Sequence, residues 1–291
     1  MNQAAESWTI GKVLRWAQDD FAERGLSAPR LDAELLLCEC LGLNRVQLIT
    51  DSSRPLTASE LGAFRGLIKR RRGGEPIAYI LGRREFWGLE FRTDSRALVP
   101  RPDTEALVEV ALERTRHLNL FGTAVDVCTG SGCVAIAFHH ERPTWHVIGS
   151  DLSADALALA RENALRLGSV WGMAWQQSDL LEAIPRGVGL DLITANAPYI
   201  PSSEIPELDV DVRGFEPALA LDGGSDGLEL IRRLAPSALE RLSPGGVLAL
   251  ELHHDQANRV EALLVELGFR NTLRKKDYAG HERVVSGQKP G

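Results

Sequence analysis

The chain has 291 residues, of which 44% are hydrophobic and 25% charged, and its formal net charge is -7 at pH 7. This balance is typical of a globular protein and excludes a disordered one, and the negative charge disfavours stable binding of nucleic acid by broad phosphate neutralisation. No apolar run reaches the roughly 18 to 20 residues of a membrane span, and residues 1–10 lack the layout of a secretory signal, so we expect a cytoplasmic protein with no membrane partner.

Residues 1–73 have apolar side chains at helical spacing, which predicts a small helical domain. Residues 57–60 read Thr-Ala-Ser-Glu, a capping box that favours the start of a helix. Four consecutive cations, Lys69 to Arg72, form a strong basic run within residues 1–85, which carry 13 Lys/Arg against 11 Asp/Glu. Two interpretations of the basic run stay open: a solvated helix end whose cations complement the helix dipole, or a contact with RNA or an acidic partner.

Residues 74–100 change to short apolar runs separated by Gly and Pro, which predicts a hairpin linker. These runs are Ile77–Leu81, Phe86–Trp87, Leu89–Phe91 and Ala97–Val99.

Residues 101–291 alternate predicted strands with helix-like segments, the pattern of an α/β domain whose parallel sheet is covered on both faces. The predicted parallel strands are Ala124–Val127, Trp145–Gly149, Met173–Gln176, Leu190–Ala195 and Val247–Glu251. Two further segments, Phe269–Leu273 and Arg283–Ser286, predict an antiparallel hairpin on the same sheet, which makes seven strands.

A glycine turn and two acidic residues follow the first three predicted strands. The turn, residues 126–132, reads Asp-Val-Cys-Thr-Gly-Ser-Gly, and Ala135 stands where a dinucleotide site has its third glycine. Asp151 closes the second strand, where a carboxylate accepts ribose hydroxyls, and Asp179 after the third strand is placed to accept from an adenine amino group. Alone, the turn is also compatible with a tight connection and Asp179 with a helix N-cap. Together they predict an adenosine site without a phosphate cradle, as S-adenosylmethionine requires, built from Asp126, Thr129, Gly130, Ser131, Gly132, Asp151, Ser178, Asp179, Leu180 and Asn196.

The segment Asn196-Ala-Pro-Tyr199 follows the fourth predicted strand, at the edge where open parallel sheets bind ligands. By itself an Asn there is ordinary turn chemistry. The segment resembles the (Asn/Asp)-Pro-Pro-Tyr motif of amino-methyltransferases, which act on planar nitrogens of adenine, cytosine and glutamine. An amide nitrogen is a poor nucleophile because its lone pair is delocalised. The Asn196 side-chain oxygen and the Ala197 carbonyl offer two acceptors for an amide NH₂, and Tyr199 an aromatic wall; we assign the chemical step to Asn196, Ala197, Pro198 and Tyr199.

Further segments resemble the release factor glutamine methyltransferase family over most of the chain. They are Pro76–Gly82, Glu85–Trp87, Leu98–Glu105, Gly214–Pro217 and Asp222–Leu228. The stretch Pro-Arg-Pro-Asp-Thr-Glu at residues 100–105 is particularly specific, because nucleic-acid enzymes that share the Asn-Pro-Pro-Tyr motif lack it.

The resemblance implies a Rossmann-like seven-stranded methyltransferase domain, a helical substrate-recognition domain and a hairpin linker. It also implies N5-methylation of the glutamine in the Gly-Gly-Gln loop of peptide chain release factors, with S-adenosylhomocysteine as the product and no metal. The residues expected at the substrate are Arg101, Pro102, Glu105, Asn196, Pro198, Tyr199 and Glu216. The segment Asp103–Glu105 is also compatible with an ordinary first helical turn.

Other functions compete with this interpretation. A sister branch methylates a ribosomal protein, but its pattern diverges after the first Pro-Arg. A nucleic-acid amino-methyltransferase would need a basic cleft, whereas the rest of the chain after residue 85 carries a net charge of -9, the total of -7 less the +2 of residues 1–85. A binding module without catalysis is the third class. The chain departs from the family at Ala197, where the motif has proline, which leaves rigidity and substrate preference open.

Several further residues have structural interpretations that need no catalytic role. Cys38, Cys40, Cys128 and Cys133 are expected to be reduced core residues. The pairs His139-His140 and His253-His254 are not expected to bind metal, because adjacent side chains point apart. Four acidic residues after the motif form either a solvated loop or a lid over the substrate glutamine: Glu204, Glu207, Asp209 and Asp211.

Overall fold

The computed structural model describes residues 7–118 and 120–291. Residues 1–6, part of the N-terminal segment that we expected not to be a secretory signal, lie outside the described residues. The chain divides into two compact units. Unit 1 comprises Met1–Gly82 and Val210–Phe215, and unit 2 comprises Arg83–Asp209 and Glu216–Gly291. Among the described residues, no helix is long and apolar enough to cross a membrane.

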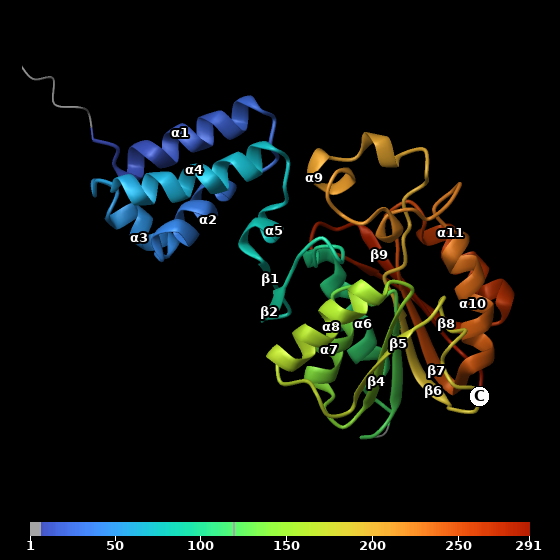
Figure 1. The fold of residues 1–291 in the computed structure, drawn as a ribbon. Helices are drawn as coiled ribbons and strands as arrows, with labels where there is room; N and C mark the ends of the chain where they lie inside the picture. Colours follow the sequence, from blue (N-terminus) through green and yellow to red (C-terminus); the bar gives the residue numbers. More distant parts are fainter. Residues whose placement is uncertain (1–6, 119) are drawn as a thin grey trace, which may run out of the picture. The chain divides into compact units, whose positions relative to one another are not determined.

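Unit 1 is helical, as predicted (Figure 1). Its helices are α1 Ile10–Glu23, α2 Pro29–Leu41, α3 Arg45–Thr50, α4 Ala58–Arg72, α5 Ile77–Leu81 and α9 Val210–Arg213. The capping box at the start of α4 is present, because Thr57 and Glu60 each accept from the other's backbone N–H. The compact unit continues beyond residue 73, through α5 to Gly82.

Helix α5 corrects the assignment of Ile77–Leu81 to the hairpin linker. Pro76 precedes the helix, and Gly82 ends it in the left-handed region at φ 70°. A five-residue apolar run carries no periodicity that separates a buried helical turn from a strand, which is why the sequence pattern misled here.

The basic run lies in the last turn of α4, and its three arginines are paired within unit 1. Arg71 is only 3% exposed; its Nε donates to Asp32 (2.7 Å) and its Nη1 to Asp211 (3.3 Å). Arg70 pairs with Glu75 (2.7 Å), and Arg72 with Asp20 (2.7 Å). The run is therefore an exposed helix end at Arg70 and Arg72, which pair with carboxylates at the surface, whereas Arg71 is buried with its partner Asp32.

Unit 2 contains the predicted seven-stranded sheet. Its strands are β3 Thr123–Val127, β4 His146–Asp151, β5 Met173–Gln177, β6 Leu190–Ala195, β7 Leu242–Glu251, β8 Arg270–Lys276 and β9 Glu282–Gln288. They lie in the order β5-β4-β3-β6-β7-β9-β8. Strands β3 to β7 are parallel, and β8 and β9 form the expected antiparallel pair, with β9 also antiparallel to β7.

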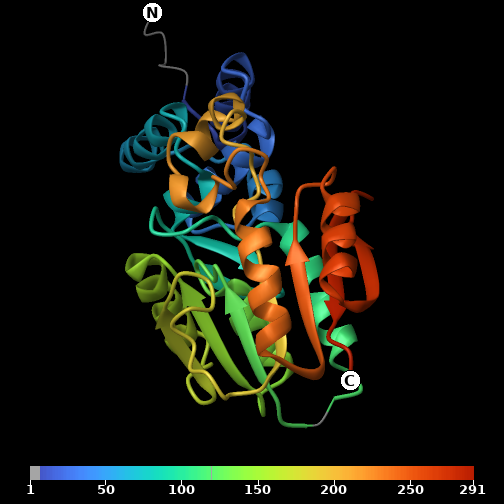
Figure 2. The same cartoon turned by 90° about the vertical axis from the view of Figure 1, so that its right-hand side faces the viewer.

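Helices cover both faces of the sheet (Figure 1). They are α6 Glu105–Arg114, α7 Cys133–Glu141, α8 Ala154–Arg166, α10 Glu229–Arg241 and α11 Ala257–Leu267. Two consecutive residues of β6 show the two faces of the sheet. Ile193 packs in the core with α10 and α11, whereas Leu192 packs in a cluster with α7. Figure 2 shows the arrowheads of the parallel strands at one edge of the sheet, where we expected the site.

A two-stranded hairpin precedes the sheet, as predicted. Its strands are β1 Arg83–Phe86 and β2 Leu89–Arg92, in antiparallel register. Trp87 and Gly88 form the turn, both with positive φ (55° and 69°). Glu105 stabilises this turn, since its carboxylate accepts from the Trp87 backbone N–H at 2.9 Å.

Candidate active site

The glycine turn joins β3 to α7, and Asp126 near the end of β3 holds it in place. The two carboxylate oxygens of Asp126 accept from the hydroxyls of Thr129 (2.6 Å) and Thr194 (2.7 Å). Burial raises the pKa of Asp126 to about 6, although both hydroxyls oppose the shift. Gly130 needs its glycine because its φ is 54°. The sequence predicted the turn but not the contribution of Thr194, which comes from a neighbouring strand.

Asp151 ends β4 and meets the glycine turn. Its Oδ2 accepts from the Gly130 N–H and its Oδ1 from the Ser153 N–H, both at 2.9 Å. Burial raises the pKa of Asp151, whereas these backbone hydrogen bonds lower it. Each carboxylate oxygen has a second lone pair, so Asp151 retains acceptor capacity toward the pocket that it lines.

The segment after β5 lines the same pocket with Ser178, Asp179 and Leu180. Asp179 is paired with Arg233 of α10 at 2.6 Å. Leu180 has a positive φ of 51°, and the Ser178 hydroxyl accepts from the Ala183 N–H, so the segment is a defined turn and Asp179 caps no helix.

The segment after β6 divides between the pocket and the core. Asn196 and Pro198 line the pocket, whereas the Ala197 side chain is 1% exposed and belongs to the main core of unit 2. The Asn196 Nδ2 donates to the Thr104 hydroxyl at 3.2 Å. Tyr199 lies behind them: its backbone carbonyl accepts from Gln256, and burial raises the pKa of its phenol.

The family motif at residues 100–105 is placed at this pocket in part. Arg101 and Thr104 line the pocket, and Arg101 is paired with the buried carboxylate of Glu216 at 2.6 Å. Pro102 begins the 3-10 helix η1 Pro102–Thr104, and Glu105 is engaged with the hairpin turn described above. Neither Pro102, Glu105 nor Glu216 is among the residues that line the pocket.

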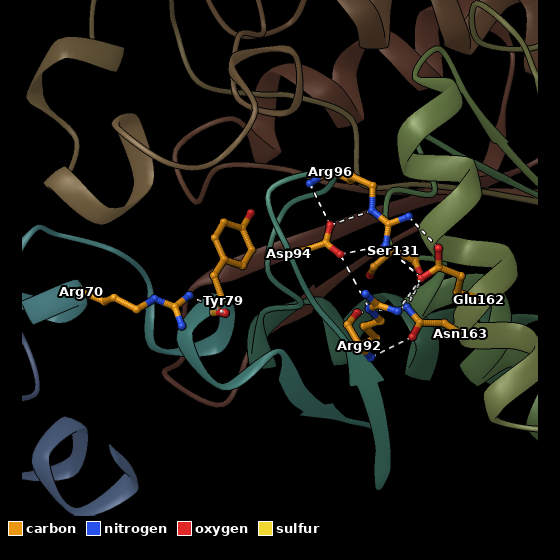
Figure 3. A network of polar contacts seen from close by, with 8 residues as sticks. All are labelled: Arg70, Tyr79, Arg92, Asp94, Arg96, Ser131, Glu162 and Asn163. Atoms are coloured by element: carbon orange, nitrogen blue, oxygen red, sulfur yellow. Dashed lines mark hydrogen bonds and ion pairs between the residues drawn. The ribbon is translucent and has the colours of Figure 1, made fainter. Parts of the chain in front are cut away.

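A polar network fixes the chain that forms one wall of the pocket (Figure 3). Arg96 pairs with Asp94 and with Glu162 of α8, both at 2.8 Å. Asn163, fully buried on α8, accepts from the Arg92 N–H (2.8 Å) and donates to the Ser131 carbonyl (2.9 Å). The wall and the glycine turn are therefore tied to the same helix.

The cavity enclosed by these segments measures about 200 Å³. All the cofactor residues predicted from the sequence line it except Gly132, which is the N-cap residue of α7. Sequence reasoning missed several lining residues, namely Leu98, Val99, Cys128, Leu219, Ala220 and Arg233. Leu98 and Val99 carried a signal as part of the family segment Leu98–Glu105, and Cys128 as part of the glycine turn; the others are set by the fold.

The chemistry of the lining fits a cationic adenosine compound. Three carboxylates, those of Asp126, Asp151 and Asp179, line the cavity. Its three arginines are each paired with carboxylates, Arg96 with Asp94, Arg101 with Glu216 and Arg233 with Asp179. A phosphate would find no cation without a partner, whereas hydroxyls, an amino group and a sulfonium find acceptors and apolar walls. The donor set therefore fits S-adenosylmethionine.

The histidine pairs and cysteines lie outside any metal-binding arrangement among residues 7–118 and 120–291. His139 is buried on α7, and His253 contacts Asp255 through its Nδ1 at 2.6 Å. All four cysteines are free and half-buried.

Comparisons with known proteins give matches over the whole chain. Residues 12–82 match the family described as PrmC N-terminal domain, and residues 124–209 the family described as Methyltransferase domain. A release factor glutamine methyltransferase from Geobacter sulfurreducens is 43% identical over 289 residues, which cover 99% of this chain and 99% of that protein. A protein of the same name from Bradyrhizobium diazoefficiens is 44% identical over 97% of this chain and 93% of its own. Among solved structures, a methyltransferase from Pyrococcus furiosus has a similar fold, with a TM-score of 0.51 and 20% identity over 70% of this chain and 90% of that chain.

Proposed function

Because the chain belongs to the release factor glutamine methyltransferase family, we propose that it methylates the side-chain amide nitrogen of a glutamine in a peptide chain release factor, with S-adenosylmethionine as donor. Identity above 40% over nearly the full length of both proteins carries this proposal. The expected target is the glutamine of the Gly-Gly-Gln loop, and the expected compartment is the cytoplasm, where release factors act.

The cofactor residues hold the donor and keep it oriented. When bound, S-adenosylmethionine supplies a methyl group that its sulfonium charge makes electrophilic. Asp151 accepts the ribose hydroxyls, and the segment Ser178–Leu180 receives the adenine. Gly130 allows close approach of the backbone. Asp126 holds the turn in place and retains lone pairs for the amino group of the methionine part.

Asn196 and Ala197 prepare the glutamine amide for reaction. The amide carries two N–H donors, and the Asn196 Oδ1 and the Ala197 carbonyl are two acceptors on consecutive residues after β6. Holding both N–H groups fixes the plane of the amide, so that the nitrogen lone pair points toward the methyl group. Catalysis then comes from positioning and preorganised hydrogen bonds.

The remaining predicted residues shape the entrance for the substrate. Pro198 lines the pocket directly, and Tyr199 behind it supports the wall. Arg101, fixed by the buried Glu216, contributes a guanidinium to the lining and is available to a backbone carbonyl of the glutamine loop. Pro102 and Glu105 support this rim through η1 and the hairpin turn.

A methylation assay tests the proposal. Purified protein is incubated with labelled S-adenosylmethionine and release factors, and the modified peptide is mapped by mass spectrometry. We expect one added methyl group on the Gly-Gly-Gln glutamine and none on a release factor whose glutamine is replaced by alanine. Label in RNA, DNA or ribosomal protein, with the release factor unmodified, would contradict the proposal.

A further inference from the structure

Glu251 is a buried carboxyl group that the proposed chemistry does not use. It ends β7, is 1% exposed, and its Oε2 has no hydrogen-bond partner among the described residues. Burying a carboxyl group without full pairing is unfavourable, and the neutral amide of glutamine would have nearly the same shape. A position that keeps this group invites a functional explanation.

The sheet register brings Glu251 next to the catalytic segment. Ala195 of β6 lies opposite Leu250 of β7 in the parallel ladder. The next residues along the two strands, Asn196 and Glu251, therefore leave the sheet at the same edge, side by side. Glu251 itself is not among the residues that line the pocket.

Thr104 connects the two side chains. Its hydroxyl accepts from the Asn196 Nδ2 at 3.2 Å, and it hydrogen-bonds the Glu251 carboxyl group. Thr104 is 2% exposed and lies at the junction of η1 and α6, so its hydroxyl has few alternatives. A hydroxyl can donate only one hydrogen bond. If Thr104 donates it to the Glu251 carboxylate, the lone pairs of the Thr104 oxygen are left to accept from the Asn196 NH₂.

Glu251 is not needed to neutralise the nearest cation. Arg283 is paired with Asp277 at 3.0 Å and with Asp103 at 3.5 Å, and no ion pair joins it to Glu251. The groups that face Glu251 are Thr104, Arg283, Asp103 and Tyr199. Thr104 and Tyr199 are the hydrogen-bond partners of Glu251 among these groups. Of the two, Thr104 lines the pocket, and its hydroxyl is bonded to the Asn196 side chain.

We propose that Glu251 is a positioning residue that, through the Thr104 hydroxyl, orients the Asn196 carboxamide with its oxygen toward the reacting amide. The proposal rests on the role given to Asn196 in the proposed function. A carboxamide can flip, and the flipped form would present NH₂ donors to a substrate that itself carries donors. The ionised carboxylate selects the productive orientation because it accepts a hydrogen bond from the Thr104 hydroxyl. A protonated Glu251 could instead donate to Thr104, and the Thr104 hydroxyl would then donate to the Asn196 oxygen.

Kinetics of four variants test the chain of hydrogen bonds. Thr104→Val removes the hydroxyl and keeps the shape, Thr104→Ser keeps the hydroxyl, and Glu251→Gln removes the charge. Thr115→Val is the matched control, because Thr115 is equally buried and its hydroxyl donates to the Ala111 carbonyl within α6. We expect kcat to fall about tenfold in Thr104→Val and Glu251→Gln, with KM for both substrates nearly unchanged. Thr104→Ser should recover most of the kcat lost in Thr104→Val, and Thr115→Val should retain wild-type kcat.

Two further readouts separate positioning from a merely structural role. The double variant Thr104→Val/Glu251→Gln should be no slower than Thr104→Val alone, because both changes break one chain. In the wild type kcat should rise with pH as Glu251 ionises, and Glu251→Gln should lose that limb of the profile. Additive losses, or an unchanged pH profile, would overturn the proposal.

Hydrogen exchange of the Asn196 side-chain amide, measured by NMR without substrate, tests the proposal apart from activity. Its signals are identified by their disappearance in Asn196→Ala. Exchange should be slow in the wild type and Thr104→Ser and about tenfold faster in Thr104→Val. Equal exchange in all three overturns the positioning role even if release factors are methylated. Slow exchange lost in Thr104→Val, in a protein that methylates no release factor, overturns the proposed function and leaves the orientation of Asn196 supported.

Discussion

Asn196 and Thr104 are joined by a hydrogen bond of 3.2 Å in which the amide nitrogen donates, which leaves the Asn196 oxygen for the pocket. Replacing Asn196 by alanine removes one of the two acceptors for the substrate amide. We expect kcat to fall by roughly 10²–10³, the usual effect of losing one preorganised hydrogen-bond partner. Cofactor affinity, measured by calorimetry, should stay nearly intact. Loss of cofactor binding in Asn196→Ala would show that the role assigned to Asn196 is wrong.

Asp151→Ala should act on binding instead of chemistry. The carboxylate is expected to accept the ribose hydroxyls, and it also holds the Gly130 N–H. Charge-assisted hydrogen bonds contribute about 1.5–3 kcal/mol each, so the Kd for S-adenosylmethionine should rise at least about tenfold. Asp155→Ala is the control, because Asp155 is an exposed acidic residue in the first turn of α8. Equal affinities of the two variants would contradict the assignment.

Ala197→Pro restores the motif of the family and should remain active. Pro198 already restricts Ala197 to extended conformations, and no hydrogen bond of the Ala197 N–H is found among the described residues. The restriction of φ is worth roughly 0.4–1 kcal/mol, so turnover should be unchanged or raised less than about tenfold. Because the Ala197 side chain is buried in the core, the melting temperature is measured alongside. A folded but inactive variant would contradict the two-acceptor arrangement.

Arg71→Met should destabilise unit 1. It leaves the buried carboxylate of Asp32 without its partner, and breaking one side of a buried ion pair typically costs about 3–5 kcal/mol. Urea unfolding followed by the fluorescence of Trp8 and Trp16 measures the change. Lys69→Met, an exposed change on the same helix turn, should have little effect. If both variants unfold like the wild type, Arg71 is not important for stability.

Glu251 should make stability depend on pH. Burial raises its pKa from 4.5 to about 7, so the folded protein retains a proton that the unfolded chain releases. The contribution of Glu251 to the free energy of unfolding is fully present below pH 4.5 and is lost as the pH rises through about 7. Wild type should therefore lose about 3 kcal/mol relative to Glu251→Gln across this window. Asp126, with a pKa of about 6, titrates in both proteins and cancels. Parallel stability curves would contradict the burial of an ionisable group.

Local pattern predicted most of the fold of unit 2. Apolar runs of strand length, each followed by a turn, located the strands, and the close spacing of the last two predicted their antiparallel pairing, which the structure confirms. The glycine turn and Asn196 were recognisable for a similar reason. Each follows a strand directly, so its place at the sheet edge is determined by neighbours in the sequence.

Contacts between distant segments were not predictable in this way. Arg71 and Asp211 are 140 positions apart in the chain, and nothing in either local sequence indicates their pairing. Thr104 and Glu251 likewise meet only because η1 and β7 end at the same edge of the sheet. One signal for Glu251 was available: a single acidic residue within the apolar run of residues 247–252.

The membership of Val210–Phe215 in unit 1 has a consequence for how such proteins can be recombined. The chain passes between the units after Gly82, after Asp209 and after Phe215, so no single cut separates them. Val210 and Phe215 pack so closely on Gly74 that a methyl group there would lie 2.8 Å from the Val210 side chain. A chimera that exchanges only the first 82 residues would join a foreign helical domain to the segment Val210–Phe215, whose side chains fit the original domain. Grafting must transfer both segments together, and a single crossover does so only if it also carries residues 83–209 of unit 2.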